Sequence, residues 1–133
     1  MAKTSNARFH QIYSIAYAAG MAALNAAKPT PMGVVEADIY GNPLPNGRSY
    51  CVSEGACGFA WVTIRPGNCA FANWLKRNQY ARRGYGGGVQ IWVSEGGQSM
   101  QRKEAFAAAF RGVLNEFQEE LGFKSAYSGS RMD

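Results

Sequence analysis

The sequence is poor in the residues that build catalytic or metal centres. It contains one histidine, His10, and three cysteines, Cys51, Cys57 and Cys69, with no CxxC pair. A structural zinc site usually needs four closely spaced Cys or His ligands, and this set does not offer them. We interpret the cysteines as buried or idle thiols of a reducing cytosol, and we expect no metal and no cofactor.

The chain also lacks a long apolar run. No stretch approaches the ~20 apolar residues of a transmembrane helix, and the N-terminus has no continuous apolar core before a cleavage site. We therefore expect neither a membrane span nor a signal peptide. With 133 residues, 47% of them hydrophobic and only 17% charged, the composition is that of one globular domain, residues 1–133, and not of a disordered chain.

The positive charge is concentrated in one segment. The whole chain carries +5, but residues 65–103 alone hold seven basic side chains and a single acid, Glu95. A localised excess of positive charge creates a field that attracts anions. Nucleic acid, a nucleotide or an acidic protein are therefore the partners to consider.

Three segments have the apolar periodicity of helices. Each follows a residue that can cap its first turn, and Gly122 after the last one suits a left-handed helix terminus. The predicted helices cover residues 5–27, 69–79 and about 99–121. Their predicted caps are Ser5 or Asn6, Asn68, and Ser99. The last helix has an apolar stripe that we expect to be buried, formed by Phe106, Phe110, Val113, Leu114, Phe117 and Leu121.

The remaining apolar runs predict strands. "SYCVSEG" and "CGFAWVTIR" lie close together and predict a hairpin, and the second run is apolar on both faces, as in a central strand covered on both sides. Further strands are predicted at 32–40, at 89–93 and at "FKSAY", an edge strand before a polar tail. The order predicts an α+β fold: a single compact domain with a small, mainly antiparallel sheet on which N-terminal and C-terminal helices pack.

The segment "LKRNQYARRGYGGGVQIWV", residues 75 to 93, is the first candidate binding site. Basic side chains interleaved with aromatic rings can hold phosphates while the rings stack on bases. The glycines match neither a Walker loop nor GxGxxG. A solvated connection between helix and strand remains an open alternative. The candidate ligand-binding residues here are Lys76, Arg77, Tyr80, Arg82, Arg83, Tyr85, Gly86 and Gly87.

The start of the last predicted helix is the second candidate site. "VSEGGQSMQRKEA" runs through two glycines into a helix N-terminus, whose free amides suit an anion. Arg102 and Lys103 oppose the helix dipole in the first turn, so an external anion is one reason for their presence and a chance surface feature is the other. The candidate residues here are Gln98, Ser99, Arg102 and Lys103.

The same helix carries acids at its other end. Glu116, Glu119 and Glu120 lie near the C-terminus, where the helix dipole disfavours them. Two copies of the helix running antiparallel would set basic starts against acidic ends, as a two-fold interface requires. This pattern predicts a homodimer.

Signatures of catalysis are weak. Cys57 and His10 could act as nucleophile and base only if the fold brings them together, and no third member is evident. Glu36 and Asp38 share one face of a predicted strand, but no further ligand accompanies them. We therefore expect a protein that is not an enzyme.

Several blocks together resemble a family of small uncharacterised proteins encoded by tailed bacteriophages. The blocks are "PTPM", "CGFAWVTIRPG", "FANWLK", "YGGGVQIWV", "GQSMQRKEA" and the terminal "SRMD", and the likeness runs from about residue 17 to the end. The resemblance implies a phage protein that acts in the host cytoplasm, or a component of the virion. It carries no established activity and no site residues.

These patterns predict a small non-enzymatic protein whose basic face binds nucleic acid or a nucleotide, with interference in host processes as a further expectation. The alternative is a virion component, or an inhibitor that docks on a host protein. A strong salt dependence of oligonucleotide binding would favour the first interpretation. Detection in purified particles would favour the second.

Overall fold

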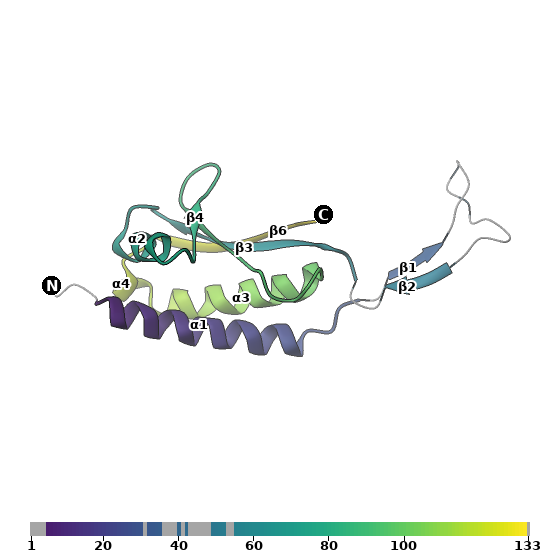
Figure 1. Cartoon of the computed structure of the whole chain (residues 1–133), viewed down its shortest axis with the longest axis horizontal. Coiled ribbons are helices and arrows are strands. Elements are labelled where there is room, and N and C mark those ends of the chain that lie inside the picture. Colours follow the sequence, from purple (N-terminus) through teal and green to yellow (C-terminus); the bar gives the residue numbers. More distant parts are fainter. Residues whose placement is uncertain are drawn as a thin grey trace.

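The chain folds into a layer of helices and a layer of antiparallel strands (Figure 1). The computed structural model describes residues 5–30, 32–35, 40, 42, 49–52 and 55–132. The predicted α+β class is confirmed. The elements are α1 (Asn6–Ala26), β1 (Met32–Val35), β2 (Ser49–Val52), β3 (Gly58–Arg65), α2 (Ala70–Arg77), β4 (Arg82–Arg83), β5 (Val89–Trp92), α3 (Met100–Glu116), α4 (Gln118–Leu121) and β6 (Ser125–Met132).

The main sheet has four strands in the order β4-β5-β3-β6, and every neighbouring pair is antiparallel. β3 is central, as predicted, and it pairs with β6 along its whole length, from Gly58 opposite Met132 to Arg65 opposite Ser125. β6 is an edge strand, also as predicted. It is longer than expected, because the residues interpreted as a polar tail continue the pairing with β3.

The predicted hairpin between "SYCVSEG" and β3 is wrong. β2 pairs instead with β1, with Val52 opposite Met32, and this two-stranded sheet lies beyond the C-terminal end of α1 (Figure 1). The physical reason is that β5 and β6 occupy both edges of β3, so no edge is left for β2. The predicted strand at 32–40 is observed as far as Val35, and Glu36 and Asp38 lie outside the described residues.

The helix starts follow the expected capping chemistry with one correction. The side chain of Ser5 accepts a hydrogen bond from the backbone nitrogen of Arg8 (3.1 Å), as predicted. At α2 the cap is Cys69, whose Sγ accepts from the backbone nitrogen of Ala72 (3.4 Å); the predicted cap, Asn68, lies one residue too early. None of the helices in the described part of the chain is long and apolar enough to cross a membrane.

The long C-terminal helix is interrupted at Phe117, which separates α3 from α4. Gly122 ends α4 in the left-handed conformation (φ 78°), as predicted. Most of the predicted stripe is buried between the helical layer and the sheet, whereas Val113 and Phe117 are only partly buried. Gly20 of α1 lets α3 approach closely, because a Cβ there would lie 2.8 Å from the ring of Phe106.

α1 and α3 run antiparallel and complement each other's charges. Arg102 Nη1, in the first turn of α3, donates to the carbonyl of Leu24 near the end of α1 (2.9 Å). At the opposite end Arg8 Nε donates to Glu120 Oε1 (2.6 Å), and this hydrogen bond lowers the pKa of Glu120. Arg102 and Glu120 thus have partners within the same chain, whereas Glu116 and Glu119 are exposed. The homodimer stays a prediction, and the charges of Arg102 and Glu120 no longer argue for it.

Candidate functional site

One face of the four-stranded sheet carries no described helix, because α1 and α3 both lie on the other side (Figure 1). The expectation that both faces of β3 would be covered is therefore wrong. Register defines the uncovered face: Trp61 lies opposite Trp92 and Gly129, and its alternate neighbours in each strand share its side. We call this surface the open face; on this side of the strands lie Phe59, Trp61, Thr63, Arg65, Arg82, Gln90, Trp92, Ser125, Tyr127, Gly129 and Arg131, of which Thr63 is buried.

Aromatic rings cross the open face from β5 to β6. The ring centroids of Trp61 and Trp92 are 4.8 Å apart, and those of Phe59 and Trp92 are 6.1 Å apart. Tyr127 on β6 is 41% exposed. A Cβ at Gly129 would lie 2.9 Å from the indole of Trp61, so this glycine gives the indole room to lie across β6. The result is an aromatic surface on which Phe59, Trp61 and Trp92 are partly buried and Tyr127 is exposed.

Arginines accompany these rings. A guanidinium beside an aromatic face gains cation–π attraction and presents its own flat surface to a ligand. None of the strand residues of the open face is acidic, so the surface combines aromatic area with positive charge alone. The guanidinium carbon lies 4.9 Å from the ring centroid of Trp92 for Arg82, 5.4 Å from that of Phe59 for Arg131, and 5.9 Å from that of Tyr127 for Arg65.

A groove borders the open face where the end of α2 meets β4 and β5. Its volume is about 510 Å³. We call it the edge groove; it is lined by Lys76, Gln79, Tyr80, Ala81, Arg82, Gln90, Trp92 and Ser94. Because Arg82, Gln90 and Trp92 belong to both, the open face and the edge groove form one continuous surface.

The amide of Gln90 is oriented by its neighbour in β5. Trp92 Nε1 donates to Gln90 Oε1 (3.1 Å). An indole N–H is only a donor, so the amide oxygen must face it and the NH₂ group points away. Gly84 leaves space for this side chain, since a Cβ there would lie 2.9 Å from Gln90 Cγ. Within the described residues the NH₂ group makes no hydrogen bond, so Gln90 offers donors to a ligand.

Gln79 is held in the groove by the way α2 ends. Its N–H donates to the carbonyl of Lys76 (3.1 Å), and the N–H of Tyr80 donates to that of Leu75 (2.9 Å). These bonds form a Schellman motif, whose left-handed position is usually glycine. Gln79 occupies that position with φ 62° and is the one non-glycine residue with positive φ in the described part of the chain. A longer side chain is therefore kept where glycine would be less strained.

The structure brings together three residues of the first predicted site. Lys76, Tyr80 and Arg82 all line the edge groove. Lys76 Nζ also donates to the carbonyl of Gly67 (2.9 Å), and the ring of Tyr80 stacks on that of Tyr13 (4.3 Å between centroids). Both side chains are thus positioned by neighbours.

The other members of that predicted site lie elsewhere. Arg83 follows Arg82 in β4 and therefore takes the opposite side of the strand. Arg77 is exposed at the end of α2, and Tyr85 is fully exposed (102%) in the loop between β4 and β5. Gly86 and Gly87 belong to the same loop and have positive φ, as a tight turn requires.

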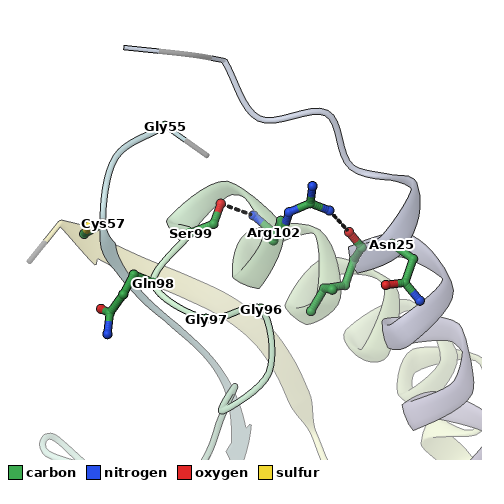
Figure 2. Close-up of a pocket in the computed structure, with 9 residues that line it drawn as sticks. Asn25, Gly55, Cys57, Gly96, Gly97, Gln98, Ser99 and Arg102 are labelled. Carbon is green, nitrogen blue, oxygen red and sulfur yellow. Dashed lines mark hydrogen bonds between the residues drawn. The ribbon is translucent and has the colours of Figure 1, made fainter. Parts of the chain in front are cut away.

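The second predicted site is occupied by internal contacts (Figure 2). The side chain of Ser99 accepts from the backbone nitrogen of Arg102 (3.3 Å), while the guanidinium of Arg102 reaches the carbonyl of Leu24. Lys103 is only 7% exposed, and its ammonium lies 5.5 Å from the ring centroid of Phe59 in β3. These partners explain the basic first turn of α3 without an external anion. Gln98 is exposed beside a separate groove at this helix start.

The cysteines and the histidine do not assemble into a reactive pair. Cys57 and Leu24, at the end of α1, line the same groove, whereas His10 lies near the start of α1, about 21 Å from Leu24 along the helix axis. Cys57 is exposed, and Cys69 is partly buried and caps α2. Within the described residues there is no group of three side chains that could hold a metal ion.

Comparison with protein-family models, with curated proteins and with solved structures finds no match for this chain. The bacteriophage resemblance therefore stays an expectation. What the protein binds has to be argued from the geometry of its own surface.

The sequence patterns did not reveal the aromatic members of the open face. Phe59 and Trp61 alternate with core residues of β3, and Trp92 does so in β5. The signal in the sequence was the alternation of large aromatic residues with core residues, but only the fold places both long helices on one side of the sheet and leaves the other side free. Large aromatic residues on such a side are candidates for binding.

Proposed function

We propose that this protein binds single-stranded nucleic acid on the open face of its sheet. The observation that carries the proposal is the set of aromatic rings on this face, three of which lie beside an arginine, with no acid among the strand residues. Aromatic rings and guanidinium planes stack on bases of any sequence, and arginines neutralise phosphates.

The shape of the surface favours a single strand over a duplex. In a duplex the bases stack on each other, and their faces cannot reach a flat protein surface. Unpaired bases can lie against Trp61, Tyr127 and the guanidinium that covers Trp92. A four-stranded sheet used in this way holds about two or three bases.

Arg82 and Arg83 provide a matched test of this proposal. They are adjacent, equally charged and both exposed, but only Arg82 lies on the open face. Arg82→Ala should weaken binding to a fluorescent single-stranded oligonucleotide, whereas Arg83→Ala should change it much less. The two melting temperatures should stay close to that of the wild type, because exposed charges contribute little to folding.

The salt dependence gives a second measurement in the same experiment. For a single strand, each phosphate that the protein no longer neutralises makes the slope of log affinity against log salt shallower by about 0.7. Arg82→Ala should show this change and Arg83→Ala should not. An equal decrease in both variants would mean that only general charge matters. Absence of binding at low salt would contradict the proposal.

A second candidate function is docking on a protein. Exposed Trp, Tyr and Arg are the residue types that dominate interface hot spots, and the open face carries all three. The absence of acids on the face favours a partner with regular negative charge, which is why nucleic acid comes first. A partner that co-purifies and is displaced by no oligonucleotide would favour docking.

Origin and location follow from the sequence resemblance alone. We propose that the protein is encoded by a bacteriophage and acts in the host cytoplasm, where host nucleic acid would be available to it. Detection of the chain in purified virions would support the structural alternative.

A further inference from the structure

Three side chains of the edge groove, Gln90, Arg82 and Lys76, present hydrogen-bond donors to it. Gln90 turns its NH₂ group away from Trp92 because its oxygen accepts from the indole. The guanidinium of Arg82, held over the ring of Trp92, has only donors and makes no hydrogen bond among the described residues. The ammonium of Lys76 is likewise a donor only. These three donors favour a ligand that presents acceptors to them.

Among the nucleobases, guanine presents two adjacent acceptors, O6 and N7, on one edge. The corresponding edge of adenine pairs N7 with an amino donor at position 6, which would face the donors of the groove. An unpaired cytosine also has two adjacent acceptors, N3 and O2, but its amino donor lies on the same edge, and thymine or uracil has two oxygens separated by an N–H donor. The O6 and N7 edge of guanine is therefore the one that pairs two acceptors with no donor between or beside them on that edge. Paired donors from arginine to O6 and N7 are the commonest specific contact to a base.

The groove also suits a flat ring that leaves the open face. Its volume of about 510 Å³ lies in the range of small-molecule sites, and one of its walls is the Trp92 ring with the guanidinium of Arg82. Gln79 reaches the same groove from α2, at a backbone position where glycine would be less strained. The strained position is consistent with a side chain that is used for binding.

We propose that the edge groove binds one guanine base and so gives the protein a preference for guanine within single-stranded nucleic acid. This inference rests on the proposed function, because the strand would reach the groove across the open face. Free guanine nucleotides share the same chemistry, and the experiment distinguishes the two sources.

The test compares short oligothymidylates that carry one central G, A or C. Anisotropy titrations should show that the strand with G binds at least about fivefold more tightly than the strand with A, the smallest ratio expected from a bidentate contact. Guanosine monophosphate is titrated in parallel as the free nucleotide.

Gln90→Glu is the decisive variant. It keeps an oxygen that can accept from Trp92 Nε1 but replaces the NH₂ donors with a second acceptor, so the ratio of G to A binding should collapse or reverse. Gln11→Glu is the matched control: it makes the same chemical and charge change on α1, where the Gln11 oxygen accepts from Arg8 Nη1 (2.9 Å). The control should keep the wild-type ratio even if its overall affinity falls.

The outcomes separate the two proposals. Binding of all strands with equal affinity would overturn the guanine preference and leave the proposed function standing. Binding of guanosine monophosphate without binding of any strand would overturn the proposed function and assign the groove to a free nucleotide. No binding of either kind would overturn both. If Gln90→Glu fails to fold, the uncharged Gln90→Met is read in its place, and an unchanged ratio in it would overturn the inference.

Discussion

Substitutions of Gln79 at the end of α2 can separate the effect of its left-handed backbone on stability from the effect of its side chain on ligand binding. A left-handed conformation costs an L residue about 1–2 kcal/mol. Glycine adopts it freely but loses about 0.4–1 kcal/mol through the greater freedom of the unfolded chain. The side chain of Gln79 is exposed, so its removal sacrifices little packing. Gln79→Gly should therefore stabilise the protein by roughly 0.5–1 kcal/mol, which corresponds to a melting temperature higher by about 2–5 °C.

Gln79→Ala completes the comparison. Alanine also carries a Cβ, so it keeps the strain of the left-handed position while it removes the polar side chain. Thermal and urea unfolding should show Gln79→Gly as more stable than the wild type and Gln79→Ala as close to it. If the side chain contacts the ligand, both variants should weaken binding to the G-containing strand by similar factors.

Two results would refute this reasoning at different points. Equal stability of the glycine and alanine variants would show that the backbone at Gln79 is not strained. Wild-type binding by both variants would show that the groove does not use this side chain, and its position at the end of α2 would then have no functional explanation.

Three further substitutions test the core, the open face and the helix pair. Phe110→Ala should lower the free energy of unfolding by about 3–5 kcal/mol in a urea titration, because the ring is buried; an unchanged curve would contradict the packing of α3. Gly129→Ala should push Trp61 off β6, shift tryptophan fluorescence and weaken oligonucleotide binding, whereas an unaltered spectrum would mean that the indole does not lie across β6. The pKa of Glu120 is lowered by Arg8, so the ion pair contributes stability above the ordinary pKa of glutamate and loses it as pH falls through the lowered value. Glu120→Gln should therefore reduce stability slightly near neutral pH and not in acid, and a constant difference at all pH values would exclude this ion pair as the cause.

Features that depend on neighbours in sequence could be predicted from the sequence. The helices, the cap at Ser5 and the left-handed Gly122 all follow from residues within one or two turns of each other. The grouping of Tyr80 with Arg82 was visible for the same reason, because one short segment carries both. Cys69 shows the limit of such rules, since its thiol replaces the oxygen that usually caps a helix.

Features that depend on distant partners could not. The sequence by itself determined a small antiparallel α+β domain with a basic segment, but strand pairing was decided by competition for the edges of β3, where β5 and β6 exclude β2. Arg102 looked available for an anion until the fold placed the end of α1 beside it. The open face likewise exists only after pairing, because its rings come from three strands and both long helices cover the opposite side of the sheet. A pattern within one strand specifies which residues share a side, and only the packing of the other elements decides whether that side is covered or left to bind a ligand.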